Sequence, residues 1–89
     1  MEVIIKRKGR QEGFDERKLY ASCYSACITT HHGKEESEQI CAQVTDAIKL
    51  FLVDKKEVDS DELFRETVRE LEKVSREAAF MYETHRDIS

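Results

Sequence analysis

The sequence predicts an α+β fold in which an N-terminal β-hairpin lies on a bundle of three or four helices. Two observations carry this prediction. β-Branched residues and a turn glycine follow one another in residues 3–9, as in a hairpin. From residue 16 onward apolar residues recur at helical spacing, and no proline interrupts them. We expect one domain over residues 1–89, with the hairpin in residues 1–15 and the bundle in residues 16–89.

The hairpin is predicted from the first fifteen residues. Residues 2–7 contain the β-branched run Val3-Ile4-Ile5 and suit a short strand. Lys8-Gly9 is a plausible two-residue turn, because glycine adopts positive φ without strain. Residues 10–14 then form the returning strand. Since an isolated hairpin is only marginally stable in water, we expect it to pack on the helices.

Two helices follow the hairpin. Asp15 is a good N-cap for a first helix over about residues 16–29, and residues 29–33 end it. The second helix, over about residues 35–52, has the most regular apolar stripe of the chain. The stripe consists of Ile40, Val44, Ala47, Ile48 and Phe51, and is widened by Cys41 and Leu52.

The last third of the chain contains one long helix or two shorter ones. Residues 53–58 read as a polar connection. Asp59 caps the third helix, with Ser60 as the competing cap. Ser75 can cap a restart, so we expect a short break there and a fourth helix over residues 77–85. One unbroken helix over residues 60–85 is the alternative.

Composition and charge restrict the possible functions. The chain is 38% charged and 39% apolar, and no apolar run approaches the roughly 20 residues of a membrane span. Residues 1–18 hold six Lys/Arg against four Asp/Glu, whereas residues 19–89 have a net charge of −6. This asymmetry disfavours nucleic acid and favours a compact polyanion such as a triphosphate. Three cysteines, with no sign of secretion, indicate reduced thiols and a cytoplasmic protein.

The positive charge is concentrated in Lys6, Arg7, Lys8 and Arg10. Alternation along a strand predicts that Lys6, and Lys8 beyond the turn, face the helices, whereas Arg7 points elsewhere unless the hairpin twists strongly. Arg and Lys are the donors that hold phosphate. Charged residues also protect the edges of a short hairpin against aggregation, so this cluster alone leaves both interpretations open.

The order of residues adds a resemblance to a known family. Its specific part is Ile4-Ile5-Lys6-Arg7-Lys8-Gly9, then Glu12, Phe14-Asp15 and Lys18-Leu19. This pattern resembles the ATP-cone domain, the nucleotide-sensing regulatory module of ribonucleotide reductases and of their transcriptional repressor. A helix start of that family is similar to Val58-Asp59-Ser60-Asp61-Glu62-Leu63. The apolar residues that follow, as far as Tyr82, fall in register with the closing apolar pattern of the family. Lys8 departs from the usual Asp or Asn, and Gly13 stands where Pro is common.

The resemblance implies a purine nucleoside triphosphate, ATP or dATP with or without Mg²⁺, between the hairpin and the helices. Lys6, Arg7 and Lys18 match positions at the phosphates. Glu12 matches a family position that bonds a polar group of the nucleotide. Phe14 matches a position that helps to form the base pocket, and Ser60 matches a hydroxyl position near the base. The full implied set is Ile5, Lys6, Arg7, Glu12, Phe14, Asp15, Lys18 and Ser60. Phe64 stands where some members have His or Gly.

Other chemistry has weaker support in the sequence. Cys23, Cys27, His31 and His32 have a spacing that could ligate zinc or pair a thiol with a base, but both cysteines fall on an apolar stripe. There is no Walker-type glycine loop and no metal-ligand set for triphosphate hydrolysis. We therefore expect a signal rather than a substrate, no catalytic residue and no metal centre.

The sequence supports two functions of different classes. The first is a non-catalytic ATP/dATP-binding regulatory module that alters its contacts with an unidentified protein, or its self-association, when nucleotide binds. The second is a helical protein-interaction module that kept the cone fold without nucleotide binding, for which Lys8 and Phe64 are the support. Without a zinc ribbon or a reductase barrel, the chain looks like a free-standing cone or one detached from its companion.

Overall fold

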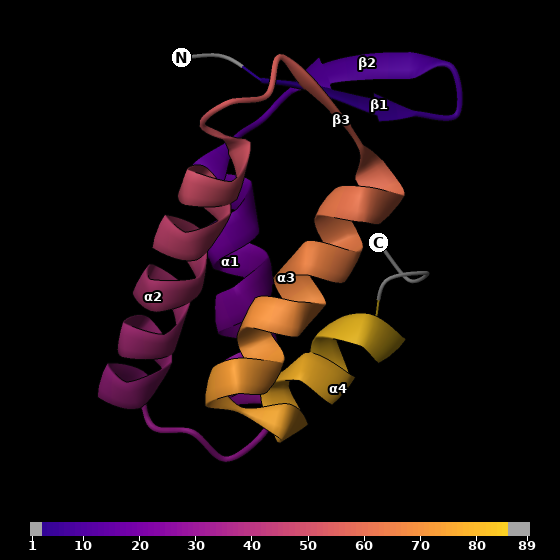
Figure 1. Ribbon diagram of the computed structural model, residues 1–89. Helices are drawn as coiled ribbons and strands as arrows, with labels where there is room; N and C mark the ends of the chain where they lie inside the picture. The colour runs from indigo at the N-terminus through magenta and orange to yellow at the C-terminus, as the bar shows by residue number, and fades with distance from the viewer. Residues whose placement is uncertain (1–2, 86–89) are drawn as a thin grey trace.

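A computed structural model describes residues 3–85 and shows a small sheet at one end of a helical bundle (Figure 1). The predicted α+β class is confirmed. In chain order the elements are β1 (Ile4–Arg7), β2 (Arg10–Gly13), α1 (Glu16–Ile28), α2 (Lys34–Leu52), β3 (Glu57–Asp59), α3 (Ser60–Val74) and α4 (Arg76–Thr84).

The predicted hairpin is present, with β1 and β2 antiparallel and Lys8-Gly9 at the turn. Both turn residues have positive φ, 45° at Lys8 and 84° at Gly9. This is the pattern of a type I′ turn, whose twist matches that of the flanking strands. Glycine adopts this conformation freely, whereas a lysine in the left-handed region is strained.

This strain predicts the effect of Lys8→Asn. Asparagine tolerates the left-handed region, so the free energy of unfolding should rise by roughly 0.5–1 kcal/mol. The urea midpoint should increase with an unchanged m-value. Lys8→Ala is the control, because it removes the same charge without the local preference of asparagine. An equal gain in both variants would attribute the effect to charge instead of backbone strain.

The third strand was not predicted, because residues 53–58 read as a polar connection. Instead, β3 pairs with β1 in parallel, so the strand order is β2-β1-β3. Val58 lies opposite Ile5, and both side chains are buried. The amide of Ile4 also donates to the carbonyl of Lys56 at 3.0 Å. A strand of three residues has too little alternation to recognise, and here the neighbouring strand and the core stabilise it.

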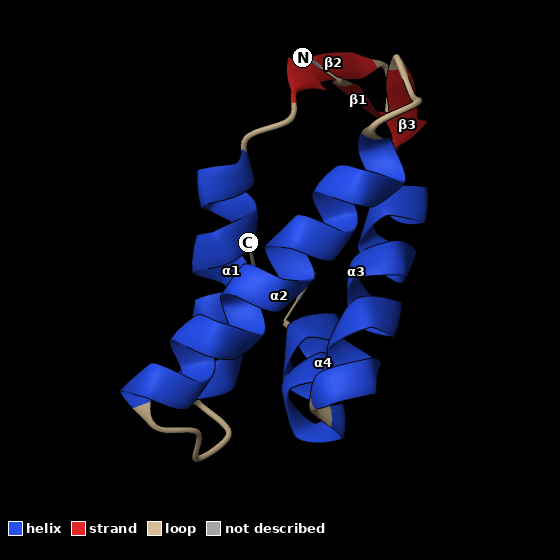
Figure 2. Ribbon diagram, turned by 60° about the vertical axis from the view of Figure 1, so that its left-hand side comes forward, coloured by secondary structure: helices blue, strands red, loops and turns tan. Residues whose placement is uncertain are grey.

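The four helices form a closed arrangement in which each packs on two others. The helix α1 lies against α2 and α4, and α3 lies against the same two (Figure 2). The predicted N-cap is confirmed, since the Asp15 carboxylate accepts from the Arg17 amide at 2.9 Å. Asp59, not Ser60, caps α3. Among the described residues, no helix is long and apolar enough to cross a membrane.

The predicted break at Ser75 is confirmed, and the unbroken helix over residues 60–85 is wrong. Ser75 is extended, with φ of −161°, and its hydroxyl accepts from the Ala78 amide at 3.1 Å. The amide of Ser75 still donates to the carbonyl of Leu71 at 2.7 Å. One serine therefore ends α3 and starts α4, and this turns α4 back against the bundle.

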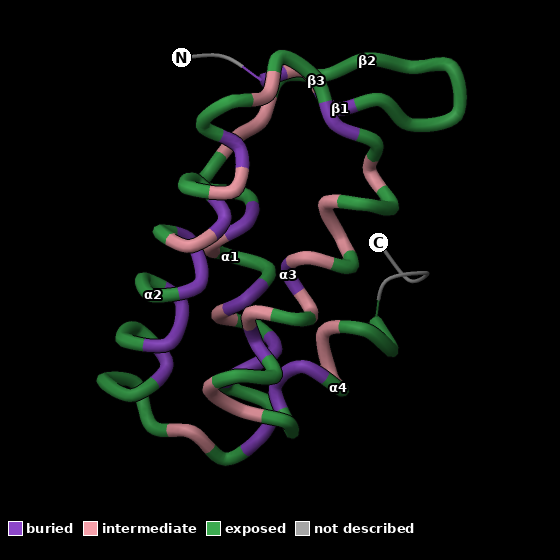
Figure 3. The backbone as a smooth tube through the Cα atoms, in the orientation of Figure 1, coloured by how far each residue is buried: buried purple, intermediate pink, exposed green. Residues whose placement is uncertain are grey.

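The core runs along the middle of the bundle and continues up to the sheet (Figure 3). The stripe predicted for the second helix supplies Ile40, Val44 and Ile48 to it, whereas Phe51 is only partly buried. The residues with no exposed surface include Cys23, Cys27, Cys41, Ile48, Leu71 and Ala78. The core closes under the sheet through Val3, Ile5 and Val58, so the sheet is fixed to the bundle by its apolar face.

Candidate functional site

The candidate site begins with the sheet face that is turned toward the helices. Ile5 and Val58 are 8% and 3% exposed, which identifies this face. Side chains alternate along a strand, so Arg7 shares the face with Ile5. The β2 partners of these two residues, Glu12 and Arg10, lie on it as well. We call Ile5, Arg7, Arg10, Glu12 and Val58 the inner face of the sheet.

The predicted orientation of the basic cluster is wrong. Lys6 lies on the outer face, where its ammonium is 3.0 Å from the carboxylate of Glu57 on β3. Arg7, predicted to point elsewhere, lies on the inner face. Because Val3, Ile4 and Ile5 are all apolar, the sequence does not reveal which alternate set is buried. The structure buries Val3 and Ile5, and this choice reverses every residue that follows along the strand.

Two helices contribute an aromatic pair, and one of them, α3, packs against β1. The ring of Phe64 on α3 stacks on that of Tyr82 on α4, with centroids 5.4 Å apart and planes at 20°. Burial raises the pKa of the Tyr82 hydroxyl, and both a hydrogen bond with Thr67 and the charge of Arg7 partly offset that rise. Arg7 is therefore close enough for its charge to act on the Tyr82 hydroxyl.

Sequence reasoning assigned Tyr82 only to the apolar register and missed its place in the site. A usable signal existed, because a tyrosine within an apolar stripe needs a partner for its hydroxyl. Thr67 on α3 acts on the Tyr82 hydroxyl and lowers its pKa, whereas the hydroxyl of Thr67 itself donates to the Leu63 carbonyl at 2.8 Å. Because Thr67 belongs to another helix, the sequence spacing of the two residues gives no indication that they lie near each other.

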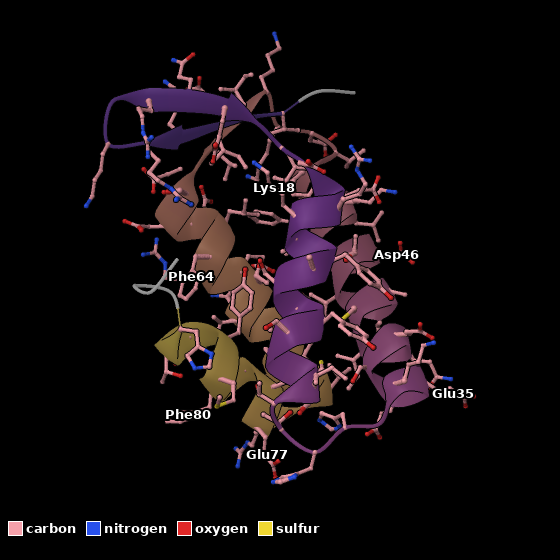
Figure 4. The ribbon with its side chains drawn as sticks, turned by 180° about the vertical axis from the view of Figure 1, so that it is seen from behind. Lys18, Glu35, Asp46, Phe64, Glu77 and Phe80 are labelled. Carbon is pink, nitrogen blue, oxygen red and sulfur yellow. The ribbon has the colours of Figure 1, made fainter. Side chains whose placement is uncertain are left out.

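The remaining predicted residues lie around the upper end of the bundle. Phe14 and Asp15 form the connection from β2 to α1, and both are half-buried. Lys18 is exposed near the start of α1, just below the sheet (Figure 4). Ser60 begins α3 and is half-buried, and Phe64 lies one turn below it on the same side of the helix.

The ion pair of Lys6 does not prevent this residue from taking another partner. The side chains of Lys6 and Glu57 are 47% and 58% exposed. Surface pairs of this kind contribute little to stability, typically about 0.2–1 kcal/mol. Separation of Lys6 from Glu57 therefore costs little free energy.

The cysteines and histidines that suggested zinc or a nucleophile are separated by the fold. Cys23 and Cys27 are fully buried, and burial raises the pKa of both thiols, that of Cys23 to about 12. The side chain of His32 instead contacts Glu36 and lies 2.9 Å from the hydroxyl of Ser75 through its Nε2 atom. Within residues 3–85, no three His, Cys, Asp or Glu side chains are grouped to hold a metal ion.

The mixed three-stranded sheet lies across the end of four helices, so the described residues form a small α+β module. The family model described as the ATP cone domain matches residues 2–79 of the 89-residue chain, which therefore belongs to the ATP-cone family. ATP cones are non-catalytic, nucleotide-sensing regulatory domains that generally bind ATP or dATP. No curated protein and no solved structure gives a significant match.

Proposed function

We propose that this chain binds ATP or dATP beneath the inner face of its sheet and acts as a regulatory module. The observation that carries the proposal is that Arg7 shares the inner face with Ile5 and that its charge lowers the pKa of Tyr82, which stacks on Phe64. A guanidinium supplies charge-assisted donors to phosphate, and aromatic rings supply a stacking surface for a base. The nucleotide remains intact, because it serves as a signal.

The contacts follow from the family and the geometry together. Arg7 and Lys18 would hold the phosphates, joined by Lys6 once it leaves Glu57. Glu12 would accept from the nucleotide, and Ile5 and Phe14 would form apolar walls. Asp15 and Ser60 would place polar groups at the edge of the base. The proposal therefore keeps the full predicted set and adds Tyr82. It includes no fixed role for Mg²⁺.

The regulatory output would come from the position of the hairpin relative to the bundle. The hairpin is held by Ile5 on one side of β1 and overhangs the helices along β2, whose four residues are all exposed. A nucleotide under the hairpin would favour one position of it over another. Because a ligand shifts only those states that it binds unequally, the output would be altered contact with a protein partner or with a second copy. We also propose a cytoplasmic location, which the three unpaired cysteines support.

One observation favours the second function, a protein-interaction module without a nucleotide. The rings of Phe64 and Tyr82 stack on each other, and burial raises the pKa of the Tyr82 hydroxyl. A base would have to stack on this pair or displace it. If the pair is fixed, the space that the nucleotide needs is already filled, and the fold would serve protein contacts alone.

Calorimetric titration separates the two functions. We expect saturable heat with ATP or dATP, with and without Mg²⁺, together with a rise in the unfolding temperature, because a ligand that binds only the native state stabilises it. Inorganic triphosphate is the control for attraction of charge alone and should bind more weakly. Light scattering of the same samples reports any change in self-association. No heat and no thermal shift at millimolar nucleotide would leave the interaction module as the function.

A further inference from the structure

The strand β2 lies at one edge of the sheet. The strand order is β2-β1-β3, so among the described residues β2 has a neighbouring strand on one side alone. All four of its residues, Arg10–Gly13, are exposed. We call the free side of this strand the β2 edge. A free edge is a template for pairing with another chain, and the residues along it decide which chain fits.

One hydrogen bond at the base of the hairpin shows which backbone groups point out of the β2 edge. The amide of Phe14 donates to the carbonyl of Val3 at 2.8 Å, so these two residues form a hydrogen-bonded pair. Such pairs alternate with non-bonded pairs along an antiparallel ladder, and Glu12 therefore also turns its backbone groups toward β1. The N–H and C=O groups of Gln11 and Gly13 point away from β1, out of the β2 edge.

Charge then selects the way in which a second copy can pair with the β2 edge. In a symmetric antiparallel pair, outward-pointing groups must meet outward-pointing groups, so the two-fold axis passes through a residue. An axis at Arg10 or Glu12 would bring like charges face to face, and one at Gly13 would extend the pairing into Phe14-Asp15, beyond the strand. An axis at Gln11 places Arg10 of each copy opposite Glu12 of the other. Two oppositely charged pairs then form at once.

The helices leave room for this arrangement. The two-fold axis is perpendicular to the sheet, so both inner faces stay on the same side while the strand direction is reversed. Figure 1 shows that the hairpin turn extends beyond the helices. The two helical bundles therefore lie under opposite ends of the joined sheet.

We propose that the β2 edge pairs in antiparallel with the β2 edge of a second copy, with Gln11 at the two-fold axis. The result is a symmetric dimer with one six-stranded sheet. Only one short strand of each copy takes part, so the dimer belongs to the weak, transient class. The pairing needs no nucleotide and goes beyond the function proposed above. Because Glu12 also belongs to the proposed nucleotide set, the test uses nucleotide-free protein.

Sedimentation velocity at increasing protein concentration should show a monomer–dimer equilibrium. Arg10→Glu and Glu12→Arg should each weaken dimerisation about tenfold, because each variant places two like-charged pairs in the contact. An equimolar mixture of these two variants should dimerise as well as the parent protein, since each variant then meets the opposite charge. Lys34→Glu is the matched control. It makes the same change in net charge at the exposed start of α2, far from the sheet, and should alter dimerisation less than about twofold (Figure 1).

Amide hydrogen exchange of the parent protein locates the contact. The amides of Gln11 and Gly13 should become more protected as the concentration rises, whereas that of Glu12, which points toward β1, should not change. Gln11→Pro removes one outward N–H group and leaves the bonds to β1 in place. It should abolish the dimer with little effect on the unfolding temperature.

Three results would overturn the proposal. A protein that stays monomeric at the highest attainable concentration would leave the β2 edge to a strand of another protein. A dimer that persists in both charge variants and in Gln11→Pro would place the contact on the helices. A mixture that dimerises no better than the separate variants would exclude the register centred on Gln11. If a variant does not fold, the exchange of Gln11 and Gly13 in the parent protein still decides the question.

Discussion

Replacing Arg7 by alanine should weaken the binding of ATP or dATP at least tenfold. A charge-assisted hydrogen bond to phosphate contributes roughly 1.5–3 kcal/mol, which is about one to two orders of magnitude in affinity. Arg7 lies on the inner face and is exposed, so its removal should not disturb the core. Calorimetric titration of both variants measures the difference directly. Arg69→Ala is the matched control, because Arg69 is an exposed arginine of α3 paired with Glu66 at 2.9 Å.

The same titration of Lys6→Ala tests which face of the hairpin meets the nucleotide. Lys6 lies on the outer face and would have to exchange Glu57 for phosphate, so its loss should cost less than that of Arg7. The family pattern alone treats the two residues as equal neighbours. A greater loss for Lys6 than for Arg7 would mean that the hairpin presents its other face to the nucleotide, in disagreement with the burial of Ile5.

Replacing Leu71 by alanine should have the largest effect on stability. Leu71 is fully buried in the last turn of α3 and belongs to the core of the domain. Such substitutions cost about 2.7–5 kcal/mol, because the protein loses burial and gains a cavity. Domains of this size are stable by about 5–15 kcal/mol in total, so a large part of the stability would be lost. The urea midpoint of the nucleotide-free protein is the appropriate measurement.

Leu50→Ala is the control for that substitution. Leu50 has the same side chain on α2 but is 74% exposed, and its truncation should change the free energy of unfolding by less than about 0.5 kcal/mol. Similar losses at both positions would mean that Leu50 is covered in solution, for example by a second copy of the chain. Comparison of the two substitutions therefore also tests whether the α2 surface around Leu50 is exposed to solvent.

These variants separate folding from function. The Leu71→Ala substitution destabilises the whole domain. The apparent nucleotide affinity should therefore fall only in proportion to the fraction of protein that remains native. The Arg7→Ala substitution should lower nucleotide affinity, whereas its urea midpoint should stay near that of the parent protein. A variant that lowers both quantities would indicate that the hairpin contributes more to stability than its exposed β2 strand suggests.

Local rules determined a large part of this structure. The turn at Lys8-Gly9, the cap at Asp15 and the break at Ser75 each depend on a few neighbouring residues, and all three were predicted correctly. The apolar stripe of α2 also predicted its buried side, because helical periodicity repeats over five turns. The family pattern depends on residue order in one segment, and it too is readable from the sequence.

Contacts between distant segments decided the rest. The strand β3 exists because β1 offers it a free edge, and Tyr82 joins the site because Thr67 and Arg7 approach it from other elements. Which side of β1 faces the helices was decided by the burial of Val3 and Ile5, since three successive apolar residues fit either side equally well. The sequence by itself thus determined which elements form and which family the chain belongs to. Only the tertiary structure decided that Arg7, and not Lys6, faces the helices, because a strand turns alternate side chains to opposite sides.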